Sequence, residues 1–183
     1  VLQNSQITVT GVNINPTRDG IIEVLKNMGA DIKIVNIKNV SAEEVADIEV
    51  RSSNLHATDI DKKIMPRLVD EIPILALCAT QAEGTTFISG AKELRVKESD
   101  RLFAVCTQLK KMGADIKETE DGLIIRGKTK LTGCKVDSFK DHRIAMMLSI
   151  AGLIADGTTD ISDSQCVNIS FSNFYEVLKS VCI

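Results

Sequence analysis

The sequence predicts an α/β (α+β) protein built from repeated βαβαββ units around buried helices. A nine-residue segment, "LKNMGADIK" at Leu25–Lys33, returns 84 residues later as "LKKMGADIK" at Leu109–Lys117, with eight of nine positions identical. Two apolar runs, Asp70–Gly90 and Arg143–Asp163, both continue into an acidic residue followed by Gly-Thr-Thr. Repetition of this kind is typical of one supersecondary unit packed several times. We expect about three units around one core, in a single domain spanning residues 1–183.

The composition is that of an ordinary soluble protein and limits the partners. The 183 residues are 44% hydrophobic and 26% charged, with a formal net charge of −3 and 3% aromatic residues. An acidic balance and few aromatic rings argue against a nucleic acid partner, and no apolar run is long enough to span a membrane. The five cysteines are widely spaced and form no CxxC pair, which indicates a reduced, cytoplasmic protein. With only His56 and His142 available, we expect no zinc site.

The first repeat predicts an amphipathic helix followed by a strand. Its apolar residues recur with helical period from Ile21 to Met28. Asn15-Pro16 is a helix-start signal, and Gly29 follows the last apolar position as a stop. The next residues, "ADIKIV", alternate as in a half-buried strand. The start of the chain, "VLQNSQITVTGV", lacks an initiator Met and alternates at once, which indicates a piece of a larger protein.

The remaining elements follow the same order. The two apolar runs predict helices that are buried on all sides, because they have no polar face. The second repeat predicts an amphipathic helix from Leu102 to Met112 that stops at Gly113. Asp121-Gly122 then predicts a hairpin turn into a further strand.

An arginine stands at or just before the start of each predicted helix: Arg18, Arg67, Arg101 and Arg143. A helix N-terminus already carries partial positive charge, so a cation there is unfavourable unless an anion joins it. The alternative is that these arginines are solvated or pair with the neighbouring Asp19, Asp70, Asp100 and Asp141. Four at equivalent places favour an anionic substrate.

The most highly charged stretch is "ELRVKESDRL", Glu93–Leu102. Its apolar residues have the spacing of a strand that enters a helix, the position where α/β proteins bind ligands. Lys97 beside Glu98 forms a pair whose pKa values depend on how far it is dehydrated. A solvated charge run is the alternative interpretation.

Three segments carry a resemblance to a known family: "RVKESDRL" (Arg95–Leu102), "KDHRIAMM" (Lys140–Met147) and "PRLVDEIP" (Pro66–Pro73). Together they resemble 5-enolpyruvylshikimate-3-phosphate synthase, also called 3-phosphoshikimate 1-carboxyvinyltransferase. The resemblance extends from end to end of the chain and covers only the C-terminal domain of that enzyme, so the N-terminal domain is absent.

The resemblance implies a fold of six βαβαββ units, three in each of two domains, known as the inside-out α/β barrel of enolpyruvyl transferases. It implies a bacterial, cytoplasmic enzyme of aromatic amino acid biosynthesis, monomeric at full length, with the active site between its domains. The reaction transfers the enolpyruvyl group of phosphoenolpyruvate to the 5-hydroxyl of shikimate 3-phosphate. No metal or organic cofactor is implied.

The resemblance also implies roles for individual residues. Asp70 would accept the proton of the attacking hydroxyl, and Glu98 would handle the proton at the methylene carbon of phosphoenolpyruvate. Lys97 would contact both substrates. The phosphoenolpyruvate anion would be held by Arg101 and Arg143.

At three places the resemblance does not decide which residue contacts the substrates. His142 flanks the site, either as a direct contact or as a hydrogen-bonded neighbour. Some members have Asn where this chain has Glu93, and some carry a basic residue in the last segment, where Ser164–Asn173 has no Lys or Arg.

Two alternative functions remain. The first is the sister enzyme that transfers enolpyruvyl to UDP-N-acetylglucosamine, whose family does not resemble "VKESDR". The second is a non-catalytic repeat module that binds an anion; it would have no use for Asp70 and Glu98 beside its arginines. As part of the enzyme that the motifs resemble, the isolated chain is expected to be inactive, because half of the cleft is missing.

Overall fold

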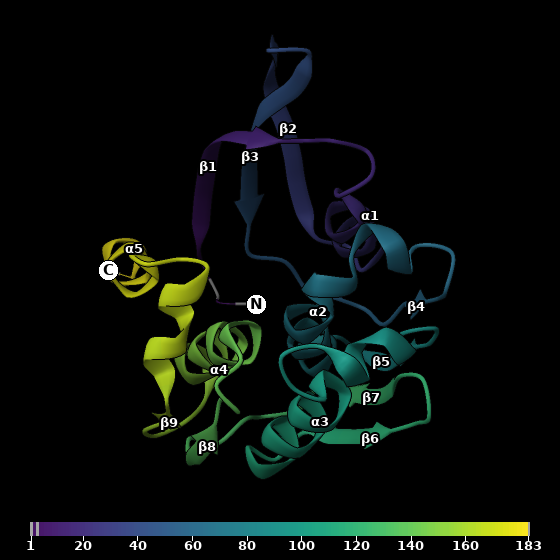
Figure 1. Cartoon of the computed structure of the whole chain (residues 1–183), viewed down its shortest axis with the longest axis vertical. Helices are drawn as coiled ribbons and strands as arrows, with labels where there is room; N and C mark the ends of the chain where they lie inside the picture. The colour runs from purple at the N-terminus through teal and green to yellow at the C-terminus, as the bar shows by residue number, and fades with distance from the viewer. Residues whose placement is uncertain (1, 3, 183) are drawn as a thin grey trace.

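The computed structural model describes residues 2 and 4–182, which contain five α-helices and nine β-strands (Figure 1). The first segment comprises β1 (Gln6–Asn13), α1 (Gly20–Asn27), β2 (Asp31–Val40) and β3 (Glu43–Arg51). The second comprises β4 (Asp59–Ile60), α2 (Ile72–Gln81), β5 (Gly84–Ile88), α3 (Arg101–Lys111), β6 (Asp115–Glu118) and β7 (Leu123–Gly127). The third comprises β8 (Lys135–Asp137), α4 (His142–Ile154), β9 (Asp160–Ser162) and α5 (Phe174–Val181).

The second segment is a complete βαβαββ unit. Its sheet has the order β4-β5-β7-β6, with β4 and β5 parallel and the other two pairs antiparallel. The predicted unit is therefore present once in full.

The first and third segments each repeat a part of this unit. The sheet β1-β3-β2 has the order and directions of β5-β7-β6, with α1 in the place of α3. The parallel pair β8-β9 corresponds to β4-β5, with α4 in the place of α2. Figure 1 shows the three sheets on three sides of the molecule, with α2 and α4 between them.

The two apolar helices form the centre of the core, as predicted. In α2, Ile72, Leu75 and Leu77 are each at most 1% exposed, and α2 packs against α3, α4 and β7. Burying one such side chain stabilises the fold by about 1.5–3 kcal/mol. Within residues 2 and 4–182, no helix is both long enough and apolar enough to cross a membrane.

The repeated nonapeptide ends a helix in the same way twice. Gly29 and Gly113 have φ of 85° and 97°, a conformation that favours glycine after a helix. The methionines before them, Met28 and Met112, are fully buried. Their carbonyls accept N–H hydrogen bonds, each 2.9 Å long, from the chain that begins the next segment. The repeat is therefore an architectural device that joins one unit to the next.

The α5 helix shares a four-residue segment with α1 but not its surroundings. Both contain "EVLK", which aligns Val177 with Val24 and Val181 with Met28. Val24 and Met28 are 3% and 0% exposed, whereas Val177 and Val181 are 41% and 48% exposed. A strand pair follows α1 and α3, but in the described part of the chain none follows α5. Phe174 and Leu178 of α5 pack in a small cluster with Ala145 and Val167, whereas the edge formed by Val177 and Val181 is uncovered.

Several local predictions are wrong. The α1 helix begins at Gly20, because Asn15 uses its side chain to close a turn rather than to cap a helix. The stretch Glu93–Leu102 was expected to begin as a strand, but its first residues belong to the 3₁₀ helix Lys92–Val96. The sequence patterns predict four helices, whereas the structure also contains α5. They do not predict the hairpin from β2 to β3. That hairpin turns on Ser41 and Ala42, which both have positive φ without being Asn or Gly.

Candidate active site

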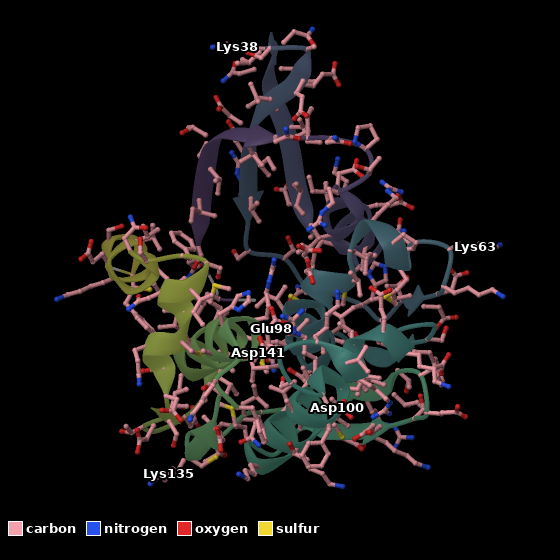
Figure 2. The ribbon with its side chains drawn as sticks, viewed as in Figure 1. Lys38, Lys63, Glu98, Asp100, Lys135 and Asp141 are labelled. Carbon is pink, nitrogen blue, oxygen red and sulfur yellow. The ribbon has the colours of Figure 1, made fainter. Side chains whose placement is uncertain are left out.

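The helix starts of α2, α3 and α4 meet at one place, and the predicted site residues lie there. Asp70 belongs to a 3₁₀ turn that leads into α2, Arg101 is the first residue of α3, and Asp141 is the N-cap of α4. Figure 2 shows Glu98 and Asp141 close together in the middle of the molecule, whereas Lys38, Lys63 and Lys135 point outward from its periphery.

Arg101 is a buried cation at the centre of the site. Its side chain is 2% exposed, and its guanidinium contacts three carboxylates. The Nε atom donates to Asp141 at 2.8 Å, Nη2 donates to Glu98 at 2.7 Å, and Nη1 donates to Asp70 at 3.1 Å. A buried charge requires such partners. The two carboxylates predicted to be catalytic, Asp70 and Glu98, are therefore held on one guanidinium.

Asp141 ties two helix starts together and was predicted only as a possible ion-pair partner. It is fully buried, accepts from the backbone N–H of Arg143 at 2.8 Å and from the Ser99 hydroxyl at 3.0 Å, and pairs with Arg101. Burial would raise the pKa of the Asp141 carboxyl, but its hydrogen bond to Arg101 and that cation's charge lower it below its ordinary value. The signal was the helix start "DHR", where Asp is a favoured N-cap.

Asp70 lies among guanidinium groups from three parts of the chain. Arg101 Nη1 lies 3.1 Å from Oδ1, and Arg18 and Arg143 approach Oδ2 at 3.4 and 3.7 Å. Burial alone would raise the pKa of the Asp70 carboxyl, but the charges of Arg143, Lys97 and Arg101 outweigh it and hold the pKa below its ordinary value. Asp70 is therefore ionised at neutral pH and able to accept a proton.

Lys97 and Glu98 lie on the loop between the 3₁₀ helix and α3, and both reach solvent. Lys97 is 33% exposed with Nζ 3.9 Å from Glu93 Oε1, and Glu98 is 51% exposed. Lys97 thus pairs with Glu93, and Glu98 pairs with Arg101, rather than Lys97 and Glu98 pairing with each other as expected. A substrate can approach both Lys97 and Glu98.

Arg95, the first residue of "RVKESDRL", holds two segments of the chain together rather than binding a substrate. It donates to the carbonyls of Thr119 and Glu120 at 2.6 and 2.8 Å, and to the carboxylates of Glu118 and Asp100 at 2.7 and 3.0 Å. These contacts fasten the loop to the turn between β6 and β7. The exposed charges on that loop consequently have a fixed position.

Arg143 and His142 begin α4 beside a pocket of about 240 Å³. Arg143 is 31% exposed and lies 3.5 Å from Glu71. His142 is 8% exposed, and its Nδ1 is buried without a hydrogen-bond partner among the described residues. The pocket is lined by three charged residues and by apolar side chains: Asp70, Glu71, Arg143, Pro73, Ile74, Met146, Met147, Ile150, Phe174.

Arg67 does not belong to the site, so the prediction that it helps bind an anion is wrong. It lies five residues before α2, in a separate 3₁₀ turn. Its guanidinium donates to the carbonyl of Pro16 at 2.7 Å and to Glu23 at 2.7 Å, and it pairs with Asp19. Arg67 instead fastens the loop before α1.

The βαβαββ repeats and the charged cluster at the helix starts define an enolpyruvyl transferase fold. An EPSP synthase from Acinetobacter baumannii superposes with a TM-score of 0.94 at 41% identity, over 98% of this chain and 42% of that one. The enolpyruvyl transferase NikO from Streptomyces tendae shares the fold, with a TM-score of 0.74 at 20% identity, over 97% of this chain and 39% of that one.

The chain belongs to the EPSP synthase (3-phosphoshikimate 1-carboxyvinyltransferase) family, which matches residues 1–178. It is 58% identical over 184 residues to the 3-phosphoshikimate 1-carboxyvinyltransferase of Endomicrobium trichonymphae. That alignment covers 100% of this chain and 43% of the relative. It is 54% identical over 183 residues to the enzyme of the same name from Geobacillus kaustophilus, over 99% of the chain and 43% of that relative. The resemblance seen in the three motifs is confirmed, and the chain spans less than half the length of these relatives.

Proposed function

We propose that this chain is the C-terminal domain of an enzyme that transfers the enolpyruvyl group of phosphoenolpyruvate to the 5-hydroxyl of shikimate 3-phosphate, with release of phosphate. The observation that supports this most is the placement of Asp70 and Glu98 on the two ends of one guanidinium, in a chain of the EPSP synthase family. The partner of this domain is the N-terminal part of the same polypeptide, in a cytoplasmic monomer.

The accessible cations are the residues that hold the anionic substrates. Arg143 and Lys97 are each about one-third exposed, and we assign the phosphoenolpyruvate anion to Arg143 and a contact with both substrates to Lys97. Arg101 is buried with its donors directed at carboxylates, so its first role is to orient Asp70 and Glu98. Arg101 contacts the phosphoenolpyruvate anion by giving up its bond to one of these two carboxylates. The Nδ1 atom of His142 is buried and has no hydrogen-bond partner among the described residues. We assign it a hydrogen bond to the substrate.

The reaction proceeds by addition followed by elimination. Asp70 takes the proton of the 5-hydroxyl as that oxygen bonds to C2 of phosphoenolpyruvate. Glu98 enters this step protonated and gives its proton to the methylene carbon C3. The product is a tetrahedral adduct. Glu98 then removes a proton from C3 and the C3–C2 double bond re-forms. Phosphate leaves with the electrons of its C–O bond and takes the proton held by Asp70. General acid and base groups of this kind each contribute roughly 10²–10⁴-fold to rate.

Two alternatives remain possible. A transferase acting on UDP-N-acetylglucosamine would share the fold, but the run "VKESDR" and the named relatives favour shikimate 3-phosphate. A non-catalytic anion binder would not require carboxylates beside its arginines, since they compete with the anion.

The test is a turnover assay of the full-length protein. We expect phosphate release from phosphoenolpyruvate with shikimate 3-phosphate as the acceptor, and none above background with UDP-N-acetylglucosamine. The reverse preference would establish the sister activity. Binding without turnover of either acceptor would establish the binding module.

A further inference from the structure

Arg18 brings a cation to the site from a segment that none of the three matching motifs includes. It lies on the loop between β1 and α1, and its Nη2 is 3.4 Å from Asp70 Oδ2. The side chain is 57% exposed, and within the described part of the chain this carboxylate is the one side-chain partner of its guanidinium. Most of its donor atoms are therefore free to bind something else.

The loop that carries Arg18 is held in place by its own hydrogen bonds. The side-chain oxygen of Asn15 accepts from the backbone N–H and the hydroxyl of Thr17, at 2.9 and 2.8 Å. The Arg18 N–H donates to the carbonyl of Asn15 at 2.9 Å, and the Arg67 side chain donates to the carbonyl of Pro16 at 2.7 Å. The backbone of Arg18 is thus fixed while its side chain remains exposed, an arrangement suited to ligand binding.

The charges around Asp70 also favour a binding role. The carboxylates of the site are Asp70, Glu71, Glu98 and Asp141, and the cations within their reach are Arg18, Lys97, Arg101 and Arg143. Arg101 is buried and paired with three carboxylates, so an anion that enters the cluster first meets the three exposed cations.

We propose that Arg18 is a further substrate-binding residue, which leaves Asp70 and places its guanidinium fork on a phosphate or carboxylate group of an anionic substrate. Its departure leaves Oδ2 of Asp70 with Arg143 alone, at 3.7 Å, and opens that oxygen to the proton of the hydroxyl. This inference rests on the proposed function and adds to it. The anionic group belongs either to phosphoenolpyruvate or to shikimate 3-phosphate, and separate titrations of the two distinguish these sources.

The test compares Arg18→Ala, Arg18→Lys and Arg143→Ala in the full-length protein, with Arg126→Ala as the control. Arg126 is 73% exposed and pairs with Asp115 at 3.6 Å on the β6–β7 strands, away from the site. KM is measured for each substrate at saturation of the other, together with kcat and Tm. Loss of one charge-assisted hydrogen bond predicts a rise in one KM of about 10- to 100-fold for Arg18→Ala.

The expected pattern separates binding from a structural role. Arg18→Lys should restore part of the affinity, because a point charge replaces only part of a planar fork. The Tm of Arg18→Ala should match that of Arg126→Ala, since both break exposed ion pairs. The substrate whose KM rises identifies the anion that Arg18 binds.

Three results would overturn the inference. If Arg143→Ala raises a KM and Arg18→Ala changes neither, Arg18 is no ligand and the proposed site stands. If neither variant changes a KM although the protein turns over, the assigned anion site is wrong as well. If Arg18→Ala lowers Tm well below the control and Lys does not restore affinity, its role is structural.

Discussion

At the scale of single residues, Arg101 is the charge around which the site is arranged. Its burial between Asp70, Glu98 and Asp141 means that it supports the fold as well as the chemistry. Arg143, at the edge of the same cluster, is exposed enough to meet a ligand. Two arginines at equivalent helix starts are therefore expected to respond differently to substitution.

We predict that Arg143→Ala weakens phosphoenolpyruvate binding by about 1.5–3 kcal/mol with little change in stability, because it removes a charge-assisted hydrogen bond at a partly exposed place. Arg101→Ala should lower the free energy of unfolding by about 3–5 kcal/mol, because it leaves Asp141 buried without its counter-charge. Ligand titration and urea unfolding of both full-length variants measure the two effects. Equal stability of the two would contradict the assigned roles.

We predict that Glu98→Gln lowers turnover by roughly 10²–10⁴-fold while substrate binding is largely kept, because the amide preserves shape and cannot transfer the proton. Asp70→Asn should behave similarly, since the attacking hydroxyl then lacks a base. Steady-state kinetics with both substrates provides the measurement. Loss of binding and turnover in equal proportion would make the residue a positioning group instead.

The buried carboxylate of Asp141 predicts a dependence of stability on pH. Its pKa is lowered in the folded state, so the unfolded chain binds more protons in the range between the two pKa values. The stabilisation it provides is complete above its unfolded pKa of about 3.9 and disappears as the pH falls through the folded value. The difference in unfolding free energy between wild type and Asp141→Asn should therefore be large at neutral pH and shrink in acid. A difference that stays constant with pH would contradict this.

At the scale of elements, predictability followed the strength of the periodic signal. The apolar helices α2 and α4 were predictable because a segment without a polar face has to be buried. The segment Lys92–Val96 was not, because the apolar alternation of Leu94 and Val96 resembles a strand, although Val96 is 84% exposed. Contacts between distant segments were also invisible in the sequence, including Arg67 with the loop before α1 and Asp141 with Arg101.

The α5 helix predicts where another part of the polypeptide docks. Its counterparts α1 and α3 are each followed by a strand pair, and the relatives are more than twice as long as this chain. We expect a strand pair from the rest of the protein to cover Val177 and Val181. In the 183-residue chain, Val177→Lys should change stability by at most about 0.5 kcal/mol. In the full-length protein it should cost several kcal/mol, because the charge is then buried.

Phe87→Lys is the matched control for this prediction. Phe87 is 48% exposed on β5, in the sheet of the complete unit, where the repeat leaves no strand to be added. It should have a similarly small effect in both proteins. Urea unfolding of the four variants checks this, and an equal cost of Val177→Lys in both lengths would refute the docking of a strand pair on α5.

At the scale of the whole molecule, we expect the site to be one wall of a cleft, with the other wall supplied by the rest of the polypeptide. Its carboxylates and arginines lie at the helix starts, and three of its cations reach solvent in this chain. Exposed ion pairs are screened and contribute little, about 0–1 kcal/mol each. Without a second wall the substrates are not oriented, which forfeits much of the roughly 7–11 kcal/mol that positioning supplies to a two-substrate reaction. We therefore expect the isolated chain to fold around its complete unit and to bind phosphoenolpyruvate weakly.

The most direct test of the split site is the rate of phosphate release from phosphoenolpyruvate and shikimate 3-phosphate, measured for the 183-residue chain and for the full-length protein in parallel. The account predicts turnover by the full-length protein and none by the chain alone, with some activity recovered when the chain is mixed with the separately produced remainder. Turnover by the chain alone at a rate near that of the full-length protein would contradict it.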